Sequence, residues 1–429
     1  MDSPLSIIAG VSLLAWLYLA FLHGGFWRAD QRMDGYADSL PRSAADWPGV
    51  VAVVPARNEA EGIERALRSL LGQDYPGAFA LLLVDDQSED ATAEIARELA
   101  ARHPHGERLE VLRSLDMPEG WVGKMWAVHT GVEAAAERFP EASLLLLTDA
   151  DVEHDRGSLR RLVCKAENEG FDLVSLMVRL HCRSAWERLL IPAFVYFFQK
   201  LYPFARINDP ASRTAGAAGG CMLVRREALE AAGGIEAIRD AIIDDCALGK
   251  ALKQPSGDRR ESPANTTCSP RGRVWVGLGA TEHSFRPYRG LADIWDMVAR
   301  SAYTQLRYSP LLLAGTVLGL ALLYLVPPLL AIACPLHGDP LASSLALATW
   351  LLMAWTYLPT LRDYGLSPLY AFLLPLSGTL YLLMTLDSAR RHRAGRGAHW
   401  KGRAGAGHVA AAMRPTLTGP AKGASGNHE

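Results

Sequence analysis

Residues 144–155 read LLLLTDADVEHD, a run of four leucines that ends on two aspartates with one alanine between them. A run this apolar predicts a strand that is buried on both faces, so Asp149 and Asp151 should stand where the strand leaves the core. Two like charges at the end of a buried strand indicate either a helix cap or a group that binds something. The choice depends on what the neighbouring strands carry at their own ends.

Two earlier apolar runs have the same form. Residues 50–54 (VVAVV) and 79–84 (FALLLV) each precede a loop and a helical pattern, and the second run ends on Asp85 and Asp86. Alternation of apolar strands with helices predicts an α/β fold whose mostly parallel sheet is covered on both faces. Ligands of such sheets bind outside the carboxyl ends of the strands. The sequence therefore predicts that the acids following these strands lie together at one edge of the sheet.

Overall composition excludes several classes of protein. The chain has 429 residues and a formal net charge of -2, with no basic stripe in its middle, which argues against a nucleic-acid partner. Six cysteines are scattered without a C-x-x-C or Cys/His cluster. A disulfide framework or a zinc site is therefore not expected, and a reducing compartment fits the cysteine usage.

Apolar segments at both ends predict a membrane protein. Residues 5–27 carry no Lys, Arg, Asp or Glu, and the first basic residues follow the run, which argues against a cleaved signal peptide. We expect a transmembrane helix in residues 1–27 with its N-terminus outside, and a cytosolic domain over residues 28–310. Three further apolar segments, residues 311–334, 341–361 and 366–386, predict a membrane region over 311–387, followed by a basic, disordered tail over 388–429.

The number of apolar segments conflicts with the placement of the basic tail. If all three C-terminal segments cross the membrane, the tail ends outside, against the positive-inside tendency. We therefore expect one of them to be re-entrant or interfacial. The aromatic stretch 184–205 fits either an interfacial helix or a helix packed on the domain, and residues 253–272 predict a disordered insertion.

Carboxylate oxygens are the ligands that Mg²⁺ and Mn²⁺ prefer, commonly one or two from the protein with substrate phosphates completing the shell. A D-x-D pair is weak by itself, and Asp155 is better explained as a cap for the helix that follows it. Asp85 and Asp86 could likewise form a turn. Lys124, in a glycine-bearing loop between the two acid pairs, could pair with a diphosphate or be an ordinary surface lysine.

The motifs VVPARNEAEGIERALRSLLGQDYP, LLLVDDQSEDAT, GWVGKMWAV, LLLLTDADV and AIIDDCALG occur in this order over residues 48–310. In this order they resemble family 2 glycosyltransferases of the GT-A fold. The stretches beginning TAGAAGGCMLVRREALEAAGG and FRPYRGLADIWDMVARSAYTQLRYSP, and the WKGR near the C-terminus, resemble the hopene-associated glycosyltransferase subgroup.

The resemblance implies a role for each matching residue. Pro55, Arg57 and Glu59 would line the nucleotide base and ribose, and Asp86 would accept a hydrogen bond from the base. Lys124 would lie near the diphosphate, and Asp149 and Asp151 would hold Mg²⁺ or Mn²⁺. Asp245 would be the general base, while its neighbour Asp244 has a supporting or helix-capping role.

A departure from the family pattern bears on the product. Processive members carry Q-x-x-R-W near the first C-terminal membrane segment, whereas residues 304–308 here read TQLRY. Arg307 is retained and would contact the diphosphate. The expected function is therefore inverting transfer of one sugar from a nucleotide sugar to a membrane lipid, with a hopanoid as the candidate acceptor.

Three other functions are the alternatives: a processive polysaccharide synthase, a non-catalytic nucleotide-sugar-binding scaffold and a transporter. The transporter is disfavoured because the apolar segments contain almost no charge. We expect a multi-pass protein of the cell (inner) membrane whose catalytic domain lies in the cytoplasm.

Overall fold

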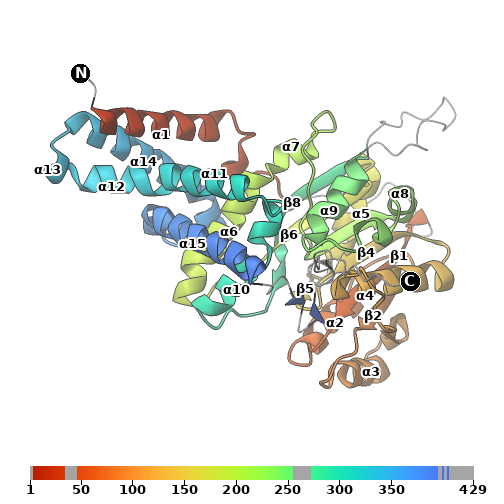
Figure 1. Ribbon diagram of the computed structural model, residues 1–429. Coiled ribbons are helices and arrows are strands. Elements are labelled where there is room, and N and C mark those ends of the chain that lie inside the picture. The colour runs from red at the N-terminus through yellow and green to blue at the C-terminus, as the bar shows by residue number, and fades with distance from the viewer. Residues whose placement is uncertain (1–2, 34–45, 255–271, 395–398, 401–402, 405–429) are drawn as a thin grey trace, which may run out of the picture.

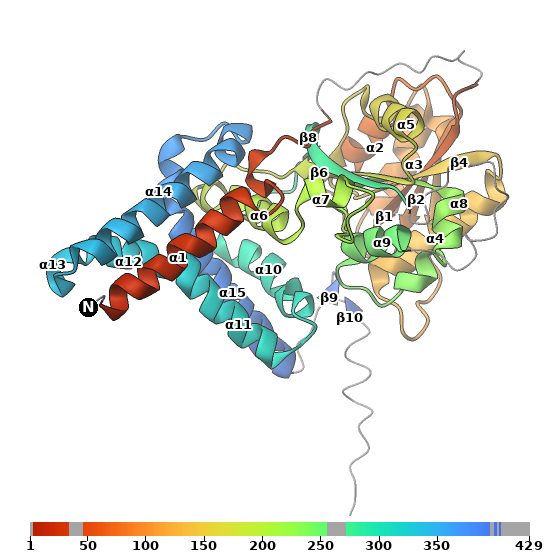
Figure 2. The ribbon, with the colours of Figure 1, turned by 90° about the horizontal axis from the view of Figure 1, so that it is seen from above.

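The computed structural model describes residues 3–33, 46–254, 272–394, 399–400 and 403–404. Figure 1 shows two parts, a sheet flanked by helices and an elongated group of helices beside it. Figure 2, turned by 90°, shows the same division.

Eight strands form one mixed sheet. They are β1 (Gly49–Ala56), β2 (Phe79–Asp85), β3 (Leu109–Arg113), β4 (Ala142–Thr148), β5 (Val152–Glu153), β6 (Leu173–Arg179), β7 (Cys221–Arg225) and β8 (Val274–Ser284). Their order in the sheet is β3-β2-β1-β4-β7-β6-β8-β5. The first four are parallel, as expected, and β8 is parallel to β6. β7 runs antiparallel to both β4 and β6, and β5 runs antiparallel to β8, so the sheet is mixed.

Helices cover both faces of this sheet. They are α2 (Ile63–Leu71), α3 (Thr92–Arg102), α4 (Gly123–Arg138), α5 (Ser158–Glu169), α7 (Phe204–Asn208), α8 (Arg226–Ala231) and α9 (Asp244–Lys253). Short 3-10 turns are η1 (Phe26–Arg28), η3 (Gly106–Arg108) and η4 (Ile235–Ile238). Apolar residues of α2, α3 and α5 share one core cluster, and those of α4, α8 and α9 share another on the opposite face.

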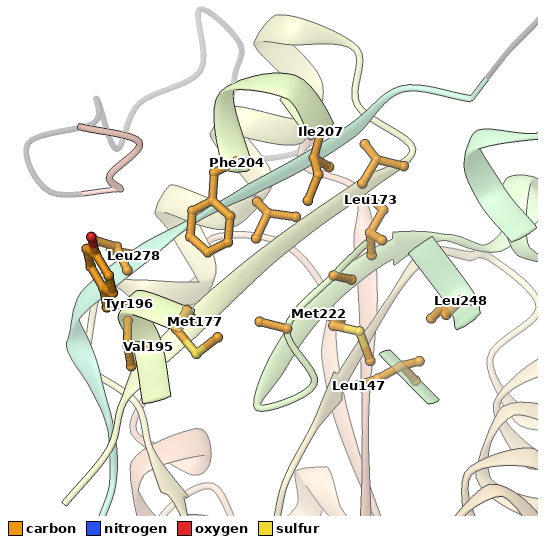
Figure 3. Packing of buried hydrophobic residues seen from close by; sticks show 14 of the residues in the cluster. Leu147, Leu173, Met177, Val195, Tyr196, Phe204, Ile207, Met222, Leu248 and Leu278 are labelled. Atoms are coloured by element: carbon orange, nitrogen blue, oxygen red, sulfur yellow. The ribbon is translucent and has the colours of Figure 1, made fainter. Parts of the chain in front are cut away.

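The four leucines of β4 divide between these two clusters. Leu144 and Leu146 belong to the cluster under α2 and α5, whereas Leu145 and Leu147 belong to the cluster under α4. Because side chains alternate across a strand, a strand covered on both faces needs an apolar residue at every position. In Figure 3, Leu147 lies in one cluster with Met222 of β7. The leucine run is thus the centre of the core.

The second part consists of apolar helices. They are α1 (Pro4–Phe21), α11 (Pro310–Leu320), the π-helical η6 (Ala321–Leu325), α12 (Val326–Ile332), α13 (Cys334–His337), α14 (Pro340–Asp363), η7 (Pro368–Leu373) and α15 (Leu374–Arg393). Four stretches among the described residues, Pro4–Phe21, Pro310–Ile332, Pro340–Asp363 and Pro368–Arg393, are long and apolar enough to cross a membrane. They correspond to the four apolar segments of the sequence. Large apolar side chains such as Leu14 (67 % exposed) and Leu311 (81 % exposed) face outward.

Two helices join the parts, α6 (Ala185–Leu201) and α10 (Leu291–Gln305). The stretch that could have been interfacial or packed is α6, and it packs on the apolar helices. The Tyr196 hydroxyl lies 2.7 Å from Thr356 Oγ1 of α14, and the Tyr381 hydroxyl of α15 donates to the Leu190 carbonyl at 2.9 Å. α6 therefore fixes the sheet to the apolar helices.

Both α14 and α15 end beside the sheet-bearing part. Asp363, the last residue of α14, pairs with Arg32 at 2.7 Å. Arg391, near the end of α15, pairs with Asp296 of α10 at 2.7 Å. The segment between them turns back within the helical group, where the Trp350 indole donates to the Phe372 carbonyl at 3.3 Å. α15 thus begins part-way along α14 and returns to the side on which α14 ends.

Two segment boundaries expected from sequence differ from the structure. Lys253 is the last residue of α9, and residues 255–271 of the expected insertion lie outside the described residues. α15 continues to Arg393, so the first residues of the expected disordered tail are helical. Beyond it, β9 (His399–Trp400) and β10 (Arg403–Ala404) pair in antiparallel fashion, and the rest of the tail lies outside the described residues.

Candidate active site

The carboxyl ends of β1, β2 and β4 meet at one edge of the sheet. In the parallel register, Ala56 at the end of β1 is paired with Asp85 at the end of β2. Asp86 follows Asp85 directly, and its backbone N–H donates to the Ala56 carbonyl at 2.8 Å. Asp149 follows β4, which pairs with β1 on the other side. The sequence prediction that these acids gather at one edge is what the topology produces.

Lys124 connects two acids of this edge. Its Nζ lies 2.9 Å from Asp149 Oδ1 and 3.1 Å from Asp244 Oδ2. Burial alone would lower the pKa of Lys124, but the two carboxylates outweigh burial and raise it. Burial raises the pKa of the Asp149 carboxyl, against the opposing effect of Lys124. The lysine expected in a loop is in the first turn of α4 and is an ion-pair partner rather than a solvated surface residue.

Arg286 makes the matching connection on the other side of the D-x-D pair. Its Nε lies 2.8 Å from Asp151 Oδ2, and its other arm contacts Glu59 Oε1 at 2.5 Å. The Ser284 hydroxyl donates to the same Asp151 oxygen at 3.2 Å. Sequence reasoning missed Arg286, because only the antiparallel pairing of Val152 with Ser284 brings it beside Asp151.

Negative charge exceeds positive charge in this cluster. The acids are Glu59, Asp149, Asp151, Asp244 and Asp245, and the cations that pair with them are Lys124 and Arg286. The described residues hold no group of three or more His, Cys, Asp or Glu side chains that could bind an ion by themselves. A divalent cation would thus rely on Asp149 and Asp151 and on oxygens from a bound substrate, which is the coordination that Mg²⁺ commonly has. The donor set and the excess charge both fit such an ion.

Asp245 is the second residue of α9 and lies beside the small-residue loop 214–220. Its Oδ2 accepts the Gly219 N–H at 2.9 Å, and its Oδ1 accepts the Cys246 N–H at 2.7 Å. α9 can approach the loop this closely because residue 249 is a glycine. A Cβ at this position would lie 2.6 Å from backbone atoms of Gly216. Burial, together with the charge of Asp244, raises the pKa of Asp245 to about 7. A base with that pKa is half ionised near neutral pH.

Asp86 and Arg57 build the neighbouring loop. Asp86 is fully buried, and its Oδ1 accepts the Ser114 hydroxyl at 2.7 Å. The Arg57 guanidinium donates to the Asp86 carbonyl at 2.6 Å and to the Gln87 carbonyl at 2.9 Å. Arg57 therefore orders the loop that carries Asp86 through its backbone.

Of the predicted nucleotide-binding residues Pro55 and Arg307, only Pro55 lies beside the acid cluster. Pro55 lines a small cavity together with Lys124, Asp149 and Asp244. Arg307 is exposed in the turn after α10 with φ +50, and the described residues give its guanidinium no ion pair. The structure brings Pro55 to the cluster and does not bring Arg307 to it.

Three other acids form turns close to helix starts. The predicted helix cap at Asp155 is wrong, because the N-cap of α5 is Gly157 and has no side-chain cap, and the N-cap of α3 is likewise Ala91. Asp85 Oδ1 accepts the Ser88 N–H at 3.1 Å, and Asp90 accepts the N–H of Thr92, the first residue of α3, at 3.1 Å. Asp155 accepts the Gly157 N–H at 3.2 Å just before α5, and it pairs with Arg161 at 2.7 Å. These acids support local structure, and the remaining strand-end acids are Asp86, Asp149 and Asp151.

Comparison with known proteins adds a family assignment for part of the chain. Residues 51–233 match the model of "Glycosyl transferase family 2". A glycosyltransferase, AglE, of Haloferax volcanii is 31% identical over 128 residues, covering 30% of this chain and 38% of the relative. The 4,4'-diaponeurosporenoate glycosyltransferase of Staphylococcus haemolyticus is 27% identical over 153 residues, covering 36% and 35%. The undecaprenyl-phosphate 4-deoxy-4-formamido-L-arabinose transferase of Pseudomonas aeruginosa is 27% identical over 189 residues, covering 42% and 48%.

The chain thus spans less than half the length of each of these relatives. A solved structure matches over a greater length: the mannosyltransferase PcManGT of Pyrobaculum calidifontis, in complex with GDP-Man and Mn²⁺. Its TM-score is 0.53 at 19% identity, and the match covers 91% of this chain and 99% of that one. The chain carries a glycosyltransferase family 2 domain of the GT-A fold, with apolar helices at both ends.

Proposed function

We propose that this protein is an inverting, metal-dependent glycosyltransferase that moves a single sugar from a nucleotide sugar to a membrane lipid. The observation that carries the proposal is the convergence of Lys124, Asp149, Asp151 and Asp245 at one edge of a GT-A sheet. The named activities of the family 2 relatives support it.

The nucleotide would bind where β1 and β2 end. Asp86 would accept a hydrogen bond from the base, with Pro55 and Glu59 beside the base and ribose. Arg57 would act by holding the Asp86 loop, since its guanidinium contacts the carbonyls of that loop. Lys124 would pair with the diphosphate. Arg307 remains a candidate for the diphosphate only if the turn after α10 moves when substrate binds.

Asp149 and Asp151 would hold Mg²⁺ or Mn²⁺. A divalent ion at this position supplies Lewis-acid stabilisation of the departing nucleoside diphosphate. Arg286 orients Asp151 by occupying its Oδ2, so that Oδ1 is left to face a ligand. The Mn²⁺ bound by the Pyrobaculum mannosyltransferase supports the choice of metal.

Asp245 would accept the proton of the acceptor hydroxyl as that oxygen attacks the anomeric carbon. Attack from the face opposite to the leaving nucleotide inverts the anomeric configuration. A carboxylate with a pKa of about 7 is matched to proton transfer near neutral pH, which an unperturbed aspartate is not. Burial of Asp245 therefore serves the chemistry that the sequence motif implies.

A lipid acceptor fits the apolar helices and the undecaprenyl-phosphate transferases among the relatives. The likeness to the hopene-associated subgroup makes a hopanoid the candidate acceptor. TQLRY in place of Q-x-x-R-W favours single transfer over a processive synthase. We place the protein in the inner membrane as a multi-pass protein with its catalytic domain in the cytoplasm. In that arrangement α15 is re-entrant, because it ends beside Asp296 of α10, on the side of the catalytic domain.

The test is release of nucleoside diphosphate by the full-length protein in lipid nanodiscs, with UDP- and GDP-sugars and total membrane lipid. Asp151→Asn should lower the rate at least about a hundredfold, whereas Asp155→Asn, the same change at a helix start, should lower it less than about twofold. Equal loss in both variants, or an undiminished rate after chelation of divalent ions, would contradict the proposed metal site.

A further inference from the structure

A large cavity lies between α10 and α15, where the apolar helices meet the sheet-bearing part. Its volume is about 700 Å³, within the range of small-molecule sites. The cavity is lined by α10, by the end of α15 and by residues 286–288. One wall is the stack of Tyr308 on His392, whose ring centroids are 4.3 Å apart.

The lining of this cavity is predominantly cationic. Four arginines line it, Arg286, Arg300, Arg390 and Arg391, against the two acids Asp293 and Asp296. Arg391 pairs with Asp296, and both Arg390 and Arg391 pair with Asp387. Within the described part of the chain, Arg300 has no carboxylate partner, and it is exposed. Arg300 is therefore the guanidinium most available to an anionic ligand.

The cavity borders the candidate active site through Arg286. That residue lines the cavity, and its guanidinium also contacts Asp151 and Glu59 of the acid cluster. A group bound between Arg286 and Arg300 thus lies next to the carboxylates that would hold the metal. This position is suited to the acceptor rather than to the nucleotide, which the strand ends on the other side of Asp151 would take.

The cavity also borders apolar surface that would face lipid. Tyr308 precedes α11, where Leu311 and Leu312 are 81% and 49% exposed. On α15, the exposed Leu383 and Leu386 lie one turn before the cavity. A ligand with a polar head in the cavity could therefore extend an apolar chain along α11 and α15.

We propose that this cavity is the acceptor headgroup subsite and that it takes a lipid with a phosphate headgroup, held by Arg300 and Arg286. The inference rests on the proposed function. It narrows the acceptor class to a phosphorylated long-chain lipid, and a hopanoid acceptor would have to carry such an anionic group. The hydroxyl that attacks the anomeric carbon is then the P–OH of the singly protonated phosphate, and its proton passes to Asp245. Guanidinium groups match phosphate through paired, charge-assisted hydrogen bonds.

The test compares two probes that differ only in the phosphate. Undecaprenyl phosphate and undecaprenol are each incorporated into phosphatidylcholine nanodiscs with the full-length protein, and bound lipid is counted by native mass spectrometry. The phosphate lipid should bind at least about tenfold more tightly than the alcohol. Arg300→Gln should lower the ratio of the two affinities about tenfold, as expected for a lost charge-assisted contact. Arg300→Lys should keep part of the preference for the phosphate lipid.

Arg393→Gln is the matched control, because it removes the same charge from the exposed end of α15 outside the cavity. It should leave binding unchanged. Equal binding of the alcohol, equal losses in both glutamine variants, or equal binding of phosphatidylglycerol would each overturn the inference. GDP- and UDP-sugar binding is measured on the same samples. Its absence would refute the proposed function, whereas nucleotide binding without phosphate selectivity would refute the headgroup subsite alone.

Discussion

Replacing Asp245 with asparagine should raise the thermal stability of the protein while it lowers the rate of sugar transfer. The pKa of Asp245 rises from 3.8 to about 7 in the folded protein. The unfolded chain therefore ionises at lower pH than the folded protein, and stability is lost as the pH rises from about 4 to about 7. Three pH units correspond to about 4 kcal/mol, and partial exposure of the side chain reduces this to about 2 kcal/mol. The asparagine oxygen can still accept the Gly219 N–H, but the hydrogen bond from the Cys246 N–H is lost, which costs about 1 kcal/mol.

The sign of the pH dependence follows from the direction of the shift. Below about pH 4 the carboxyl is protonated in both the folded and unfolded states, so the variant gains nothing from losing the charge. Between about pH 4 and pH 7 the carboxyl ionises in the unfolded chain but keeps its proton in the folded protein, so the wild-type protein loses stability over this interval. At about pH 7 and above the variant should be more stable by about 1 kcal/mol, or about 2–4 °C in Tm. The wild-type transfer rate should rise as the pH passes through about 7, because the base must be unprotonated in the folded protein to accept a proton.

The assay is a pair of pH series on detergent-solubilised protein, one of melting temperature and one of initial rate. Asp240→Asn, a change on the exposed surface shortly before α9, is the control and should alter neither series. Asp245→Asn should lose at least about a hundredfold in rate at pH 8. A rate that survives in this variant, or a stability gain that is independent of pH, would show that Asp245 is not a buried base.

Three further predictions concern other residues. Lys124→Met should raise the donor KM at least about tenfold, because Asp149 and Asp244 lose their shared cation, and Lys250→Met on the exposed face of α9 should leave it unchanged. Gly131→Ala should destabilise the domain by about 1–3 kcal/mol in thermal melts, because the alanine Cβ would lie 2.4 Å from Val53 Cγ1. An unchanged melting temperature would show that β1 and α4 can move apart to accept the Cβ. A cytoplasmic reporter fused after residue 429 should be active, and activity of a periplasmic reporter there would contradict a re-entrant α15.

The sequence predicted the features that depend on local pattern. Continuous apolar runs identified β1, β2 and β4, because a strand covered on both faces needs no polar position. The acids after these strands then had to share an edge, and Asp86 and Asp149 do. The family 2 domain and the GT-A fold expected from the motifs are confirmed.

Features that depend on distant pairing were not predictable in this way. β7 lies antiparallel between β4 and β6, and its apolar pattern is the same as that of a buried parallel strand, so the sequence does not reveal its direction. Arg286 reaches Asp151 only through the pairing of β5 with β8, across more than a hundred residues. Arg57 was expected beside the nucleotide. Its guanidinium contacts the Asp86 and Gln87 carbonyls and the Glu89 carboxylate, and no motif reveals the positions of these groups.

The elevated pKa of Asp245 also depends on packing. An isolated aspartate would be a weak base. Burial, together with the charge of Asp244, raises the pKa of Asp245, against the Gly219 N–H hydrogen bond, which lowers it. Residue identity therefore indicated the candidate base, and the fold supplies the reason that it could work.

Mass analysis of the lipid product is the most direct test of the proposed transferase. Full-length protein is incubated with a panel of UDP- and GDP-sugars, Mn²⁺ and total membrane lipid, with Asp245→Asn as the inactive control. The proposed function predicts a lipid whose mass increases by one sugar, only with the wild-type protein and only with the divalent ion. A polymeric product, or no glycosylated lipid with any donor although nucleotide binds, would contradict it.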